Sequence, residues 1–271
     1  MSVAFGDVVY EIENSKVIAF GVLHTDKEML DALNNEVCER VYDITGTNSL
    51  VNSILAGLAD TGFKKDSLMD FFTNNSDDCI SEWIVGEAYA QAYLEANFAS
   101  VLPWNLKRDI KKRGSSLPGA DIVGLRSHND TSYFLFGEVK TSSDNNYPPS
   151  IMYGPKGLKK QIEELCNEEE TIKTLVVYLG IRLINTQYWA MYQNAFVKYY
   201  ENIHNICIIG VLVRDVEPND KDLAARAKSL SSYCIDGRQI SLIAIYLPRG
   251  AISSFVEIVE TERERRRSAK C

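Results

Sequence analysis

A glutamate and a lysine two positions apart end an apolar run in the stretch 134–144, FLFGEVKTSSD. Alternate side chains of a strand face the same way, so Glu138 and Lys140 share a face with Phe134 and Phe136. Because both faces of the run are apolar, the pattern predicts a central strand whose charges lie in a partly desolvated space at its C-terminal end. Such a buried charged pair is typical of an active site. The alternative is a strand that ends in solvent, the commoner meaning of Glu-x-Lys taken alone.

A third charge, Asp121, opens the preceding apolar run, ADIVGL at 120–125. The segment SHNDT between the two runs has turn composition, so the runs are predicted to form an antiparallel hairpin. The start of one strand then meets the end of the other, which places Asp121 near Glu138 or Lys140. Two facing carboxylates repel each other unless a cation intervenes, and a lysine neutralises only one of them. A divalent cation that prefers oxygen ligands, Mg²⁺ or Mn²⁺, would balance the rest.

A fourth charge comes from the helix predicted at 79–98. Trp83, Ala90 and Leu94 recur at helical spacing, and Glu87 falls between them. A carboxylate that is buried in an apolar stripe without a partner lowers the stability of the fold by roughly several kcal/mol. We therefore expect Glu87 to lie in the site. A structural ion pair with a nearby lysine or arginine is the alternative.

Apolar periodicity and turn residues predict the remaining elements. The expected strands are 8–13, 16–22, a short one near 101–106, 120–125, 132–140, 174–180, 205–213 and 239–247, and the expected helices are 27–41, 49–72 with an interruption at Gly62, 79–98, 157–168, 184–202, 220–232 and about 251–267. The alternation indicates an α/β fold, with a mixed central sheet between helices. We expect one domain over 1–271, divided into an N-terminal helical elaboration (1–75), a core (76–180) and a strand–helix extension of the sheet (181–271).

The overall composition is that of a soluble globular protein, with 45% hydrophobic residues and a net charge of -8. This acidic balance argues against a protein that coats nucleic acid through bulk charge, although it allows a local basic groove. The N-terminal stretch lacks the pattern of a signal peptide, and the longest apolar runs are too short to cross a bilayer. The six cysteines form no CxxC pair, as expected for a reducing cytoplasm. We expect a cytoplasmic protein without membrane contact.

Two groups of basic residues are candidates for phosphate contacts. The first is a loop just before Asp121 and the second opens the helix predicted at 157–168, where N-terminal amides also favour anions. The loop contains Lys107, Arg108, Lys111, Lys112 and Arg113, and the helix start contains Lys156, Lys159 and Lys160. A solvated loop is an equally good explanation of the first group. The long link 141–157 leaves the strand directly after Lys140, so we expect it to form one wall of a substrate cleft.

The ordered set of a helix glutamate, an aspartate at a strand start, a hairpin and a terminal Glu-x-Lys resembles the PD-(D/E)xK nuclease superfamily. The motif matches at Gly119-Ala120-Asp121 and at Glu138-Val139-Lys140, although Ala120 rather than proline precedes the aspartate. The superfamily core runs helix, three strands, helix, strand. The resemblance maps it onto 79–98, the strand near 101–106, 120–125, 132–140, 157–168 and 174–180. Some relatives carry glutamine and tyrosine on the second helix; here Gln161 is present, but Leu165 stands where the tyrosine would fall.

Beyond the core, the chain resembles the HamA family, the nuclease subunits of Hachiman anti-phage defence systems. The W-x-x-G-E sequence at 83–87, LPGADIVGL, FGEVKTS and the C-terminal strand–helix alternation carry this resemblance. It implies a metal-dependent DNA nuclease that acts with a helicase encoded beside it.

The resemblance also implies roles for the candidate residues. Asp121, Glu138 and the Val139 carbonyl would bind Mg²⁺ or Mn²⁺, and Glu87 would ligate directly or through water. Lys140 would orient or help to deprotonate the attacking water. An RNA nuclease, and a non-catalytic adaptor that regulates a helicase, are the competing hypotheses. The intact Asp121, Glu138 and Lys140 favour an enzyme over the adaptor.

Overall fold

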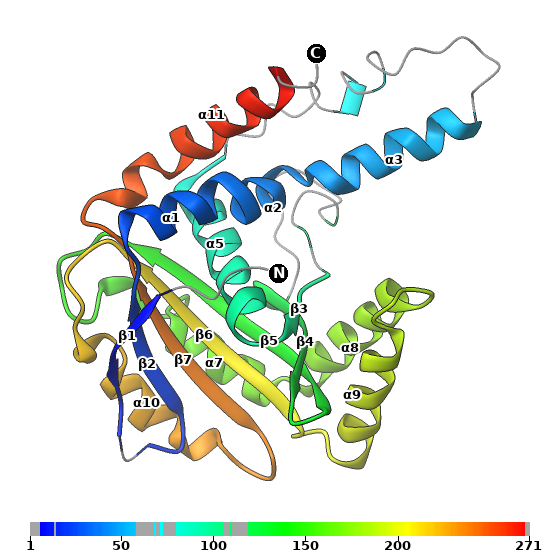
Figure 1. Ribbon diagram of the computed structural model, residues 1–271. Coiled ribbons are helices and arrows are strands. Elements are labelled where there is room, and N and C mark those ends of the chain that lie inside the picture. The colour runs from blue at the N-terminus through cyan, green and yellow to red at the C-terminus, as the bar shows by residue number, and fades with distance from the viewer. Residues whose placement is uncertain are drawn as a thin grey trace.

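The described part of the chain forms a seven-stranded mixed sheet in the order β1-β2-β7-β6-β5-β4-β3. A computed structural model describes residues 6–13, 15–57, 68, 71–72, 80–103, 105, 109 and 119–268. The strands are β1 (Asp7–Glu11), β2 (Ile18–Leu23), β3 (Ser100–Val101), β4 (Ile122–His128), β5 (Thr131–Ser142), β6 (Ile206–Arg214) and β7 (Gln239–Tyr246). Helices cover both faces of this sheet (Figure 1), so the protein has the predicted α/β class with a mixed central sheet.

Two separate sets of helices cover the two faces. One apolar core lies under α1 (Asp26–Ala32), the π-helical turn η1 (Leu33–Val37), α2 (Cys38–Tyr42), α5 (Glu82–Asn97) and α11 (Phe255–Ser268). The other lies under α7 (Leu158–Asn167), α8 (Glu169–Leu183), α9 (Trp189–Glu201) and α10 (Ala224–Leu230). The remaining elements are α3 (Ile44–Gly57) and the 3-10 turns η2 (Ser150–Met152), η3 (Asp220–Asp222), η4 (Ser231–Tyr233) and η5 (Ala251–Ser254).

Strand β5 lies near the middle of the sheet, and its side chains alternate as predicted. Phe134 and Phe136 are buried against α7, α8 and α9, whereas Leu135 and Val139 are buried on the α5 side. β4 and β5 form the predicted antiparallel hairpin, in which Ile122 pairs with Gly137. β5, β6 and β7 then run parallel to one another. The end of β5 that carries Glu138 and Lys140 therefore lies at the carboxyl edge of the parallel strands.

The predicted strand at 174–180 is wrong, because these residues belong to helix α8. Leu175, Val176 and Leu179 are buried, whereas Val177 is 60% exposed. A short apolar run fits a buried strand and a helix equally well, and here Glu169 and Glu170 in the first turn favour the helix through its dipole. The strand that follows α7 in the sheet is instead β6, reached through α8 and α9.

The helix predicted at 27–41 is interrupted rather than continuous. Thr25 begins α1 with a capping box that includes Glu28, and the chain then widens into η1 before α2. Asp43 adopts a left-handed conformation with φ 47°, which ends α2, and α3 begins at once at Ile44. α3 ends at Gly57, and most of the region predicted to continue this helix to 72 lies outside the described residues.

The C-terminal helix α11 packs closely on the N-terminal helices although its last turns are highly charged. Arg266 Nε lies 2.7 Å from Glu262 Oε1, an i,i+4 pair. However, Glu262 is buried, and Arg266 also donates to the carbonyl of Asn34 in η1. The tail therefore fixes the widened turn of the N-terminal helices to the rest of the molecule.

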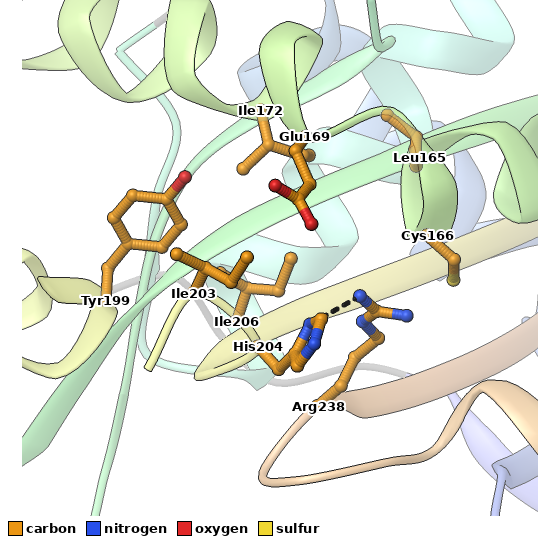
Figure 2. Close-up of a pocket in the computed structure, with 9 residues that line it drawn as sticks. All are labelled: Leu165, Cys166, Glu169, Ile172, Tyr199, Ile203, His204, Ile206 and Arg238. Atoms are coloured by element: carbon orange, nitrogen blue, oxygen red, sulfur yellow. Dashed lines mark hydrogen bonds between the residues drawn. The ribbon is translucent and has the colours of Figure 1, made fainter. Parts of the chain in front are cut away.

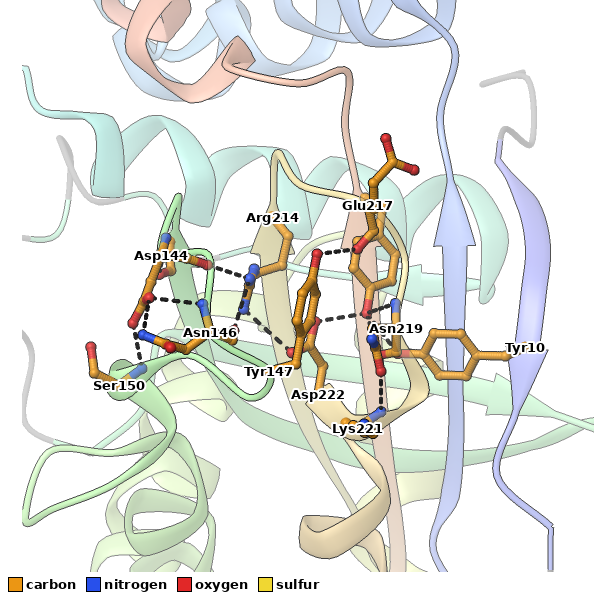
Figure 3. Close-up of polar contacts among 12 residues, drawn as sticks. Tyr10, Asp144, Asn146, Tyr147, Ser150, Arg214, Glu217, Asn219, Lys221 and Asp222 are labelled. Atoms are coloured by element: carbon orange, nitrogen blue, oxygen red, sulfur yellow. Dashed lines mark hydrogen bonds and ion pairs between the residues drawn. The ribbon is translucent and has the colours of Figure 1, made fainter.

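A polar network around the buried Arg214 and Asp222 joins the link after β5 to the end of β6 (Figure 3). The fully buried Arg214 donates to the carbonyls of Asp144 and Asn146 and pairs with Asp222, whose Oδ1 lies 3.4 Å from its Nη1. Asp144 Oδ2 in turn accepts from the backbone N–H of Ser150 at 2.9 Å. These contacts hold the chain after Lys140 in one position beside the carboxyl edge.

Candidate active site

Asp121 is held against the end of β5 by its own backbone and side chain. Its N–H donates to the carbonyl of Gly137, and its Oδ2 accepts from the N–H of Val139, both at 2.9 Å. The hairpin therefore brings Asp121 to Glu138, as the sequence predicts. Val139 takes part through its amide, and its side chain is buried on the α5 side.

Glu138 and Lys140 form an ion pair at this point, with Lys140 Nζ 3.3 Å from Glu138 Oε2. Only 5% of Glu138 is exposed. Burial, and next the charge of the adjacent Asp121, raise the pKa of Glu138 to about 9, while Lys140 opposes both effects. The interpretation of this pair as a strand that ends in solvent is therefore wrong.

Glu87 faces the same group from helix α5. Burial is the main cause that raises the pKa of Glu87 to about 9, followed by the charge of Asp121, while Lys140 lowers it. The stripe that singled out Glu87 is only partly buried, because Trp83 is 53% exposed. The structure nevertheless brings Asp121, Glu138, Lys140 and Glu87 together, so three carboxyl groups share one lysine.

Gly86 allows α5 to approach β5 closely enough for this arrangement. A Cβ at Gly86 would overlap the hydroxyl of Thr141, the residue after Lys140. Thr141 Oγ1 is buried, and among the described residues it has no hydrogen-bond partner. The glycine of the W-x-x-G-E sequence thus has a packing role next to Glu87.

We expect Gly86→Ala to lower the free energy of unfolding by about 1–3 kcal/mol, the usual range for overpacking a close contact. Urea denaturation measures the change. Gly57→Ala is the matched control, because a Cβ at Gly57 in α3 meets nothing within 4 Å and should leave stability unchanged or slightly raised. Equal stabilities of Gly86→Ala and wild type would show that α5 does not depend on this contact.

Gln91 is a site residue that the sequence analysis missed. Its Nε2 donates to the carbonyl of Asp121 at 2.9 Å, and its Oε1 accepts from Arg40 of α2 at 3.2 Å. Gln91 is buried and follows Glu87 by four residues, one helical turn. That spacing is the signal that would have found it, because i and i+4 lie on the same helix face.

The remaining candidates have less support from the structure. Gln161 lies in the first turn of α7, and its buried Oε1 has no partner among the described residues. Lys159 and Lys160 pair with Glu163 and Glu164 of the same helix, at 3.3 and 3.8 Å, and Lys156 is exposed before its start. The basic loop with Lys107, Arg108, Lys111, Lys112 and Arg113 lies outside the described residues.

The donor set suits a hard divalent cation. Asp121 and Glu138 approach within hydrogen-bonding reach, and two carboxyls in contact need a proton or a cation between them. As the described side chains stand, no three His, Cys, Asp or Glu residues are grouped closely enough to hold a metal ion. Asp121 and Glu138 are thus the pair that would hold Mg²⁺ or Mn²⁺, and Glu87 would act on the ion through water.

Comparisons with known proteins leave the site to be interpreted from its geometry. No family model matches the chain, and no curated protein matches it. Among the described helices, none is long and apolar enough to span a membrane.

Proposed function

We propose that the protein is a metal-dependent nuclease that cleaves phosphodiester bonds of DNA. The observation that carries the proposal is the grouping at the end of the hairpin, where Asp121 Oδ2 accepts from the Val139 N–H at 2.9 Å and Lys140 Nζ lies 3.3 Å from Glu138 Oε2. The order α5, β3, β4, β5, α7, β6 supports it, because it follows the PD-(D/E)xK core once α8 and α9 are taken as an insertion before the last strand. Carboxylates beside a lysine at a sheet edge fit phosphoryl chemistry.

The site residues divide the work of hydrolysis between them. Bound Mg²⁺ supplies Lewis-acid stabilisation of the phosphate and lowers the pKa of water. Asp121 and Glu138 bind and orient the reacting groups. Lys140 orients the attacking water through its Nζ and offsets the charge that develops on the phosphate. The water oxygen bonds to phosphorus as the P–O bond to the leaving nucleotide breaks, and the water proton passes to the leaving oxygen. Glu87 and Gln91 hold the site from α5.

The biological setting of the proposal is anti-phage defence in the cytoplasm, together with a helicase encoded beside the nuclease. Sequence resemblance to the HamA family supports this setting. The net charge of -8 also favours a partner that holds DNA, since the chain lacks the excess of positive charge that binds nucleic acid by itself.

The decisive experiment incubates the purified protein, alone and with its partner helicase, with linear DNA, circular DNA and RNA. Each substrate is tested with Mg²⁺ and with EDTA. Cleavage of DNA that requires Mg²⁺ supports the proposal. Cleavage of RNA alone would identify an RNA nuclease. An adaptor would cleave nothing and would still protect cells when Asp121 is changed to asparagine.

A further inference from the structure

A small pocket lies at the opposite end of the sheet from the candidate active site (Figure 2). Its wall includes Ile206, the first residue of β6, whereas Lys140 pairs with Leu212 near the other end of that strand. The pocket is open to solvent at its mouth, and its enclosed part has room for about one water-sized group. Ile172 and Ile203 give it apolar sides, and none of the residues discussed so far as catalytic reaches it.

Arg238 lines this pocket and is only 7% exposed. Its Nη2 donates to Nδ1 of His204 at 2.8 Å, and its Nε is buried without a hydrogen-bond partner. Its other polar neighbour is the Cys166 thiol, and no ion pair of Arg238 with a carboxylate is present among the described residues. A buried guanidinium without a counter-anion is costly, because its charge has lost the hydration that stabilises it in water.

The other polar groups at the pocket are arranged around Arg238. Because His204 Nδ1 accepts from Arg238, a neutral His204 carries its proton on Nε2, which is then a donor. The fifteen-residue helix α8 begins at Glu169 on the pocket wall, and no side chain caps its N-terminus. Free amides at a helix start favour anions. Among the described residues that line the pocket, Glu169 is the acidic one, and Figure 2 shows its exposed carboxyl group pointing into the pocket.

We infer that this pocket binds an oxyanion group, a carboxylate or a phosphate, on the guanidinium of Arg238. The planar guanidinium matches the oxygens of either group, His204 supplies a further donor, and the start of α8 adds a favourable field. Because the enclosed space is small, the acidic group of a ligand binds at the mouth of the pocket, beside Ile172 and Ile203. Glu169 must turn outward when the ligand enters, so it opposes binding.

The test titrates the full-length protein with sodium phosphate and, in a second arm, with sodium butyrate, at constant ionic strength and without Mg²⁺. Isothermal calorimetry and the rise in melting temperature measure binding. Saturation by phosphate only, or by butyrate only, identifies the preferred group. Arg238→Gln should weaken binding about 10- to 100-fold, the range for losing a charged hydrogen bond. Glu169→Gln should strengthen it about threefold, because a like charge is removed.

Two comparisons make the outcome decisive. Arg226→Gln removes another buried arginine with an unpaired Nε, one that lies over the Tyr153 ring instead of the pocket, and should leave binding unchanged. Failure of wild type to saturate with either probe overturns the inference. The inference is also overturned if Glu169→Gln lowers the melting temperature without tightening binding, because Glu169 would then be the counter-anion of Arg238. Arg238→Lys, which keeps the charge, retains partial binding if Arg238→Gln does not fold. None of these results depends on nuclease activity.

Discussion

Replacing Glu138 and Lys140 together with alanine should lower Mg²⁺-dependent DNA cleavage by about a thousandfold or more. Lys140 Nζ lies 3.3 Å from Glu138 Oε2 in a largely buried pair, so the double change removes the proposed metal ligand and the residue proposed to orient water. A thousandfold decrease corresponds to the loss of about 4 kcal/mol of charge stabilisation in the transition state. Single-turnover cleavage of a labelled duplex measures it, and phage protection in cells should disappear in parallel.

A matched control separates this effect from general loss of charge. Lys198 and Glu201 form an ion pair of similar length, 3.0 Å, on the exposed surface of α9. Their double replacement with alanine should leave cleavage and protection at the wild-type level. Glu138→Gln adds a second check, since it keeps the side-chain volume but removes the charge and should also be inactive. Undiminished cleavage and protection by the Glu138 and Lys140 double variant would rule out this site as the nuclease centre.

Stability without metal should fall as the pH rises from about 5 to about 9, and Mg²⁺ should reverse the trend. Glu87 and Glu138 have pKa values raised from an ordinary 4.5 to about 9 in the folded protein. The folded chain therefore holds protons that the unfolded chain has lost. This contribution to stability is complete below pH 4.5 and disappears as the pH approaches 9. Each proton held in this way gives a slope of about 1.4 kcal/mol per pH unit at most.

Mg²⁺ competes with those protons, so its affinity should rise with pH by up to about tenfold per unit for each proton displaced. Urea unfolding between about pH 6 and pH 9, in EDTA and in Mg²⁺, measures both effects. Glu138→Gln removes one titrating group, so its stability without metal should depend less on pH and respond less to Mg²⁺. If the stability of the wild type in EDTA rises with pH, Glu87 and Glu138 are not protonated in the folded protein.

The sequence predicted the hairpin and its charges well because the signals are local. Alternation along 132–140 and the turn residues after Leu125 determine which side chains face each other, and these patterns survive in the structure. The strand assigned to 174–180 failed because an apolar run of that length suits a buried strand and a helix alike. The spacing from Glu87 marks Gln91, but its partners Arg40 and Asp121 lie far from it in sequence, and no local pattern encodes those contacts.

The hydrogen bonds from Arg40 to Gln91 and from Gln91 to the Asp121 carbonyl also decide how far the motif can be moved to another protein. Every proposed metal ligand lies within 76–180, yet Arg40 lies before that segment and β6, the partner strand of β5, lies after it. A fragment of 76–180 would keep the motif and lose both supports. The hairpin and its motif therefore cannot be moved alone into another protein. A graft would also have to supply residues that replace Gln91 and Arg40.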